Sequence, residues 1–252
     1  MIKFFRKIRQ KLLSENKFSK YLIYAIGEIV LVVIGILIAL GINNWNSERL
    51  LREAAHQNLK VLKINIDKDI NQLQKSISFM DSIISFADKL NNTFQGNNTI
   101  NEKTIFYLLE LVIETNFDLK TNALEALNQR GEFNALDENI QQQITTYYSS
   151  LQKVIEREKI SNDFIKMELQ PYLIKNYSYA LINRANPWPI LQEYLKNDQR
   201  ESQIINKSDF MKDANLEGHV FARFYQIKYQ KEAYELAINK GNRLLKTLDI
   251  LH

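Results

Sequence analysis

Residues 21–42 read YLIYAIGEIVLVVIGILIALGI, and this stretch decides how the rest of the chain is organised. As a helix rising about 1.5 Å per residue, it would be roughly 33 Å long and would cross a bilayer hydrocarbon core of about 30 Å. Glu28 costs about 2.5 to 3.5 kcal/mol at a helix centre, but each large aliphatic residue returns about 0.3 to 0.6 kcal/mol. Eleven such residues lie from Ile29 to Ile42. The stretch is therefore predicted to insert as a transmembrane helix.

The excess of basic over acidic residues lies immediately before this stretch. Residues 1–47 contain seven Lys and Arg against two acids, whereas residues 48–252 contain 26 bases and 27 acids. Positive residues stay on the cytoplasmic side of a membrane, so we expect a single-pass protein of the cytoplasmic (inner) membrane with its N-terminus in the cytoplasm. The larger part would then be periplasmic. Because that part has no net basic charge, nucleic-acid binding is not expected.

Three segments follow from this topology. We expect a basic amphipathic cytoplasmic segment at 1–20, the transmembrane helix at 21–42 and a periplasmic helical-bundle domain at 43–252. The first segment places apolar residues on one helical face, which suits either a membrane-surface anchor on anionic lipid or a contact for a cytoplasmic partner; we favour the anchor.

A cleavable signal peptide is the alternative to a permanent anchor. Ala39, Leu40 and Gly41 have the small-x-small pattern of a cleavage site. The 20-residue lead and the length of the apolar stretch favour the uncleaved anchor.

One face of the transmembrane helix differs from the others. Spacings of four and three residues place the acid and the small residues on one stripe, which consists of Glu28, Val32, Gly35, Ala39 and Ile42. Small residues let helices approach closely, and an intramembrane acid is best tolerated against another helix. The stripe predicts association with a second copy or with another membrane protein. A proton-carrying role for Glu28, or a protonated acid bonded only to its neighbours, are the alternatives.

Trp45 follows the span and suits the outer headgroup level. The run NKFSKYLIYAIGEIVLVVIGILIALGINNWN at 16–46, with IRQKLL at 8–13, resembles the N-terminal hallmark of an uncharacterised family of single-pass membrane proteins common in Bacteroidota. Gly41 departs from the family, in which Gln is more frequent. Residues 121–151, TNALEALNQRGEFNALDENIQQQITTYYSSL, are similar to the family's second landmark, a helix, a Gly turn and a helix ending in paired Tyr. The family has no established activity, so the resemblance implies topology and no chemistry.

The chain beyond the span is predicted to be all-α. Apolar residues recur at a mean spacing of 3.5 from Leu59 to Ala87, and no Gly or Pro interrupts residues 46–90; this indicates one long helix with a coiled-coil or bundle face, lined by Leu59, Leu62, Ile66, Ile70, Leu73, Ile77, Met80, Ile84 and Ala87. An Asn-rich loop around Gly96 ends it.

The later helices follow from their own start and stop signals. Asn101 begins one helix, Gly131 ends a short one as a left-handed cap, and Asp137 begins a long helix that Pro171 breaks or kinks. A last helix covers about 216–251, with an apolar face of Val220, Phe224, Ile227, Tyr234, Ile238, Leu245 and Leu248. We therefore expect an antiparallel helical bundle built on three long helices.

Two aromatic features invite a binding role. Trp188 lies between two prolines in NPWP at 186–189, and it is a possible partner contact, although packing into the bundle is the more common fate of such a residue. Phe221, Tyr225 and Tyr229 on the last helix fit a core or an interface better than a ligand box.

Catalytic constellations are missing from the sequence. The chain has no Cys, and its three His, at 56, 219 and 252, have no partner at a ligand spacing. The acid pairs Asp67/Asp69 and Glu156/Glu158 lie two residues apart on predicted helices and so do not face each other. We expect no enzyme, no cofactor and no metal site.

These observations predict a non-enzymatic membrane-anchored scaffold or accessory subunit of an envelope complex, acting through helix–helix association in the lipid bilayer. The alternative is a periplasmic sensor of a ligand or of envelope stress. A third hypothesis is an ion-coupled subunit that uses the intramembrane Glu28.

Overall fold

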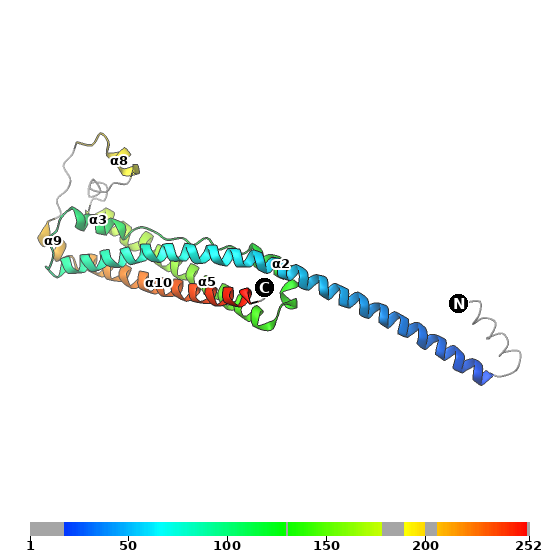
Figure 1. Ribbon diagram of the computed structural model, residues 1–252. Coiled ribbons are helices and arrows are strands. Elements are labelled where there is room, and N and C mark those ends of the chain that lie inside the picture. Colours follow the sequence, from blue (N-terminus) through cyan, green and yellow to red (C-terminus); the bar gives the residue numbers. More distant parts are fainter. Residues whose placement is uncertain (1–17, 130, 178–188, 200–205, 251–252) are drawn as a thin grey trace. The chain divides into compact units, whose positions relative to one another are not determined.

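The computed structural model describes residues 18–129, 131–177, 189–199 and 206–250 (Figure 1). It is 86% helical, and no strand lies in those ranges, which confirms the all-α class. The chain divides into two compact units, with the boundary between Gln57 and Asn58. Each unit is described by itself.

The first unit contains the N-terminal part of helix α2, whose bounds are Phe18–Phe94. In the described part of the chain, α2 is the one helix that is long and apolar enough to cross a membrane, and none of its most apolar window is buried. The sequence expectation of an apolar helix at 21–42 is confirmed.

The second unit begins with the C-terminal part of α2. It continues with α3 (Glu102–Glu110), α4 (Asn122–Gln129), η1 (Glu132–Ala135), α5 (Glu138–Phe164), η2 (Ile165–Leu169), α6 (Gln170–Tyr177), α8 (Pro189–Leu195), α9 (Lys207–Met211) and α10 (Ala214–Asp249). The three long helices are α2, α5 and α10, as predicted.

Local signals explain the element ends. Asn101 caps α3 by accepting from the backbone N–H of Lys103, and Asp137 caps α5 by accepting from that of Asn139. Gly96 and Gly131 have φ of 79° and 72°, the left-handed region that favours glycine, so each turns the chain after a helix. These four predictions are confirmed.

Cross-helix contacts give the directions of the long helices (Figure 1). Helix α10 pairs with α2 through Lys231–Asp81 and, further along α10, through Asp249–Lys63, which is earlier on α2. It bonds α5 through Tyr234–Glu158 and, further along, through Thr247–Gln143, which is earlier on α5. Helix α10 therefore runs antiparallel to both α2 and α5.

A segment without regular secondary structure completes the bundle. Residues 113–121 connect α3 to α4. Gln72 of α2 donates to the backbone carbonyl of Asn116, and Tyr148 of α5 donates to that of Lys120. We call residues 111–121 the extended segment; it lies along α2 and α5.

The predicted core face of α2 is largely confirmed, because seven of its nine residues are buried, namely Leu59, Leu62, Ile66, Ile70, Leu73, Met80 and Ala87. Ile77 and Ile84 are only half-buried, and Ile83, Leu90 and Phe94 are in the core as well.

On α10, four of the predicted core residues are buried, namely Val220, Ile227, Tyr234 and Leu248, whereas Phe224, Ile238 and Leu245 are half-buried. The core of this helix also includes residues that were not predicted, namely Leu216, Arg223, Gln230, Ala237, Gly241 and Leu244. The five residues predicted to be buried on α5 are all buried, namely Ile140, Ile144, Tyr147, Leu151 and Val154.

Pro171 does not end the helical run. The π-helical turn η2 immediately precedes α6, in which Pro171 is the second residue. Proline has no N–H and crowds the carbonyl four residues before it. The wider turn lies where that lost hydrogen bond would have been, so the chain stays helical through the proline.

Candidate functional site

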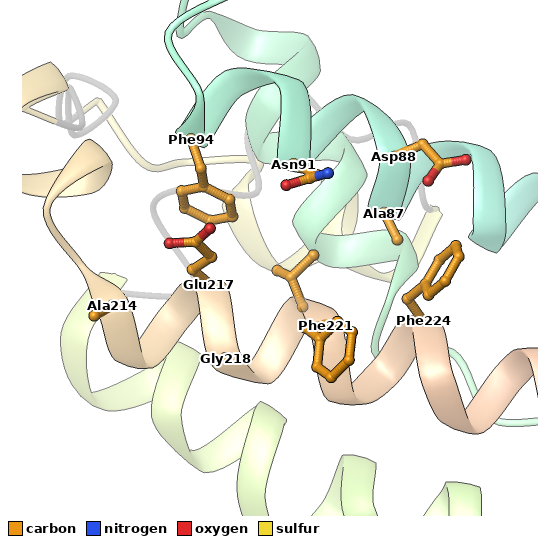
Figure 2. Close-up of a pocket in the computed structure, with 10 residues that line it drawn as sticks. Ala87, Asp88, Asn91, Phe94, Ala214, Glu217, Gly218, Phe221 and Phe224 are labelled. Carbon is orange, nitrogen blue, oxygen red and sulfur yellow. The ribbon is translucent and has the colours of Figure 1, made fainter.

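A pocket of about 530 Å³ lies between the C-terminal end of α2 and the first turns of α10 (Figure 2). Helix α2 contributes Ala87, Asp88, Asn91 and Phe94, and α10 contributes Ala214, Glu217, Gly218, Val220, Phe221 and Phe224. All ten residues belong to the second unit. Figure 2 shows Phe94 and Phe224 directed into the space between the two helices, whereas the ring of Phe221 points away from α2.

The start of α10 is held by an acid that caps the helix. Asp213 accepts a hydrogen bond from the backbone N–H of Leu216 at 2.9 Å, and from the hydroxyls of Tyr172 at 2.6 Å and Tyr177 at 2.5 Å. Burial raises the pKa of Asp213, but these hydrogen bonds outweigh it and leave the pKa below its ordinary value. The charged side chain of Asp213 therefore holds the first turn of α10, which forms one wall of the pocket.

The other wall is fixed by aromatic packing. Phe94, the last residue of α2, stacks on Phe210 of α9 with ring centroids 5.0 Å apart. Phe210 is fully buried. The pocket therefore lies between two anchored helix ends.

Its lining combines phenyl rings with carboxylates. Phe94, Phe221 and Phe224 supply apolar surface, and Asp88 and Glu217 supply negative charge. No Lys, Arg or His is among the lining residues. Such a surface can hold a ligand with an apolar body and a positive group.

A second polar cluster lies in the core and binds the extended segment. Arg223 is fully buried; its Nε donates to the carbonyl of Leu111 at 2.9 Å, its Nη2 to that of Ile113 at 3.1 Å, and its Nη1 to the hydroxyl of Ser161. Burial lowers the pKa of Arg223 to about 10, so the guanidinium stays charged at neutral pH.

Glu158 and Gln230 bind the same segment. Glu158 accepts from the backbone N–H of Phe117 at 2.9 Å and from the hydroxyl of Tyr234. Burial raises its pKa, against the lowering effect of these two hydrogen bonds. Gln230 donates to the hydroxyl of Thr115 at 2.5 Å, and its Oε1 is the one buried side-chain polar atom without a partner among the described residues.

A third buried polar group joins α2 and α5. Tyr147 donates to Asp69 at 3.0 Å. Burial raises the pKa of Asp69 to about 6, although the hydrogen bond lowers it. Both buried carboxylates thus accept from a buried tyrosine on a neighbouring helix, which satisfies their oxygens without placing them in a cavity.

This core cluster is structural in its chemistry. Its groups form hydrogen bonds with the backbone of the extended segment and with one another. No set of three His, Cys, Asp or Glu that could hold a metal ion occurs in the described residues. His56 is exposed, and His219 is half-buried against the ring of Tyr172, with centroids 4.7 Å apart.

The predicted association stripe lies on the first unit. Val32, Gly35, Ala39 and Ile42 are exposed, and Glu28 is half-buried. A Cβ added at Gly35 would meet nothing within 4 Å. The stripe is therefore a helix surface that another helix could approach closely.

The predicted aromatic contacts have different outcomes. Trp45 is 66% exposed, with the guanidinium carbon of Arg49 6.0 Å from its ring. Phe221, Tyr225 and Tyr229 are all exposed, so they do not belong to the core. Trp188 lies outside the described residues.

Sequence reasoning missed both the pocket and the core cluster. The only signal for the pocket is Gly218, a helical glycine beside Phe221. The cluster could have been found from residue spacing. Arg223 and Gln230 follow Leu216 at intervals of seven residues, so all three lie on the buried face of α10.

Comparison of the chain with protein-family models, curated proteins and solved structures found no match.

Proposed function

We propose that this protein is a non-enzymatic, membrane-anchored scaffold or accessory subunit of an envelope complex, and that it works through association of its N-terminal helix. The observation that carries the proposal is the stripe of Glu28 and small residues on an apolar helix of which the most apolar window has no buried residue. An apolar helix in lipid gains little from further apolar contact, so a face of small residues with one acid is a face for another helix.

The charge distribution supports a defined orientation. Seven bases within residues 1–47 favour a cytoplasmic N-terminus, which would place the helical bundle in the periplasm. The resemblance of residues 8–46 to the single-pass family supports the same topology.

The test compares two glycines on opposite faces of the same helix. Gly35 lies on the stripe, whereas Gly41 lies on the far side by helical spacing, and a Cβ at either meets nothing within 4 Å. Full-length protein is extracted gently from its native membrane and examined by native mass spectrometry. A homo-oligomer or stable hetero-complex that survives in Gly41→Leu and is lost in Gly35→Leu supports the proposal.

A lone monomer in the wild type would overturn it. So would an assembly that both leucine variants leave unchanged.

A second function, sensing of a small molecule by the bundle, is favoured by the pocket between α2 and α10. It lies between the ends of two long helices, where a ligand could change how tightly the helices pack. Sensing and association are compatible in one protein.

A further inference from the structure

We propose that the pocket between α2 and α10 binds a small organic cation, a molecule with an ammonium group and an apolar body. This deepens the second function above by naming its ligand class, and it does not depend on the association of the membrane helix.

The size of the pocket fits such a molecule. Its volume of about 530 Å³ lies within the usual range of about 300 to 1,000 Å³ for small-molecule sites. The inner lining is apolar and partly aromatic, with Val220 and Phe94 buried. The apolar part of a ligand would therefore be transferred from water to an apolar surface that the two anchored helix ends hold in place.

The charge of the lining selects a cation. Asp88 on α2 and Glu217 on α10 are both exposed carboxylates on the pocket, one from each helix. Within the described ranges, neither forms an ion pair with a Lys or Arg side chain. Two negative groups without a basic partner oppose an anion and favour an ammonium.

One ring of the aromatic wall already interacts with a positive group. The ammonium of Lys228 lies 5.6 Å from the ring centroid of Phe224, one of the lining residues. A cation at this distance from a ring is attracted by the ring's negative face. A ligand ammonium next to Phe94 or Phe221 would gain the same interaction in addition to that with the carboxylates.

Gly218 keeps the pocket open. It faces the pocket from the second turn of α10, and a Cβ built there would meet nothing within 4 Å. A large side chain at this position could therefore extend from its Cβ into the pocket. Gly218→Leu is therefore a blocking variant, and Gly218→Ala is its matched control.

The experiment measures binding of phenylbutylamine to the full-length protein in nanodiscs of zwitterionic lipid, by equilibrium dialysis, with empty nanodiscs subtracted. Phenylbutanol and phenylbutyrate share the apolar body and differ in charge. We expect the amine to bind about tenfold more tightly than the alcohol, and the carboxylate to bind most weakly.

The variants locate the site. Asp88→Asn and Glu217→Gln should each weaken binding of the amine by roughly threefold and leave binding of the alcohol unchanged. Both carboxylates are exposed, and an ion pair at an exposed site contributes only a little to binding. Gly218→Leu should abolish binding of both ligands, whereas Gly218→Ala should retain it. Melting curves confirm that every variant is folded.

Equal binding of amine and alcohol would overturn the cation proposal, and so would amine binding that survives Gly218→Leu. Native mass spectrometry of the same samples separates the two functions. If the amine does not bind preferentially but the assembly is unchanged, the cation proposal is wrong and the scaffold proposal is unaffected.

Discussion

The side chain of Asn162 pairs with both backbone groups of Thr115. Its Nδ2 donates to the Thr115 carbonyl at 2.8 Å, and its Oδ1 accepts from the Thr115 N–H at 3.3 Å. The amide side chain of Asn162 on α5 thus forms the pair of hydrogen bonds with the extended segment that the backbone of a neighbouring strand would form. This explains how a segment without helix or strand can lie against the core without leaving its buried backbone groups unpaired.

Asn162→Ala should therefore destabilise the bundle strongly. The substitution leaves the buried backbone N–H and carbonyl of Thr115 unpaired, which costs about 1 to 3 kcal/mol for each such group. We expect a loss of about 2 to 4 kcal/mol and a Tm lower by several degrees, measured by ellipticity. The control, Asn71→Ala, removes an exposed side chain that bonds only the carbonyl of Asp67, and should change the Tm little. Equal Tm values for the two variants would contradict the role given to Asn162.

Arg223→Lys is expected to be as harmful, although it conserves charge. The guanidinium reaches two carbonyls and a hydroxyl from one fixed plane, and a lysine ammonium cannot reproduce that fork. The buried ammonium would lack partners, so the free energy of unfolding should fall by at least about 2 kcal/mol. Arg243→Lys, on the exposed face of the same helix, is the control. Thermal melts in which Arg223→Lys matches Arg243→Lys would exclude the fork as a source of stability.

Asp69 should give the bundle a pH-dependent stability. The pKa of Asp69 is raised by burial from 3.8 to about 6, so between about pH 4 and pH 6 the folded state holds a proton that the unfolded chain has lost. Stability therefore falls as the pH rises through this window. Asp69→Asn removes the buried charge and keeps an acceptor for Tyr147.

We expect Asp69→Asn to raise the Tm at pH 7.5 by roughly 2 to 4 °C, corresponding to about 1 kcal/mol, and to reduce the fall between pH 4.5 and pH 7.5. Glu158, whose pKa is also raised by burial, keeps part of that slope. Asp67→Asn, two residues away and exposed, should follow the wild type. The assignment fails if Asp69→Asn melts below the wild type at pH 7.5.

The order of the helices was readable from the sequence because its signals are local. Asn101, Gly131 and Asp137 act on backbone groups within a few residues of themselves, so their effect does not depend on the fold. The long helices follow likewise from continuous apolar periodicity. The extended segment was not readable, because its stability comes from Asn162 and Arg223, about 47 and 110 residues further along the chain.

The pocket and the buried charges belong to the same class of unpredictable features. Asp67 is exposed, whereas Asp69 lies on the buried face of α2, where it accepts a hydrogen bond from Tyr147 of α5. The pattern on α2 alone does not show that a tyrosine on another helix pairs with this buried acid. The pocket depends on the spacing of α2 and α10, which no residue pattern on either helix specifies. Phe221 was expected in the core or at an interface, and it is 66% exposed, while Arg223 and Gln230 occupy buried positions on the same helix.

Two glycines of α10 predict opposite effects of the same substitution. A Cβ at Gly241 would lie 3.0 Å from Ile70 Cδ1 and 3.0 Å from Tyr147 Cε2, whereas one at Gly218 would meet nothing within 4 Å. Alanine is better than glycine in a helix by about 0.8 to 1 kcal/mol, so Gly218→Ala should stabilise the bundle by up to that amount.

Gly241→Ala gains the same helix propensity but crowds a ring that its hydrogen bond to Asp69 holds in place. Overpacking costs about 1 to 3 kcal/mol, so the net effect should be a loss of about 1 kcal/mol. The free energies of unfolding of both variants, measured side by side against the wild type, test the close approach of α10 to α2 and α5. If Gly241→Ala stabilised the protein as much as Gly218→Ala does, α10 would not pack as closely at Gly241 as the structure shows.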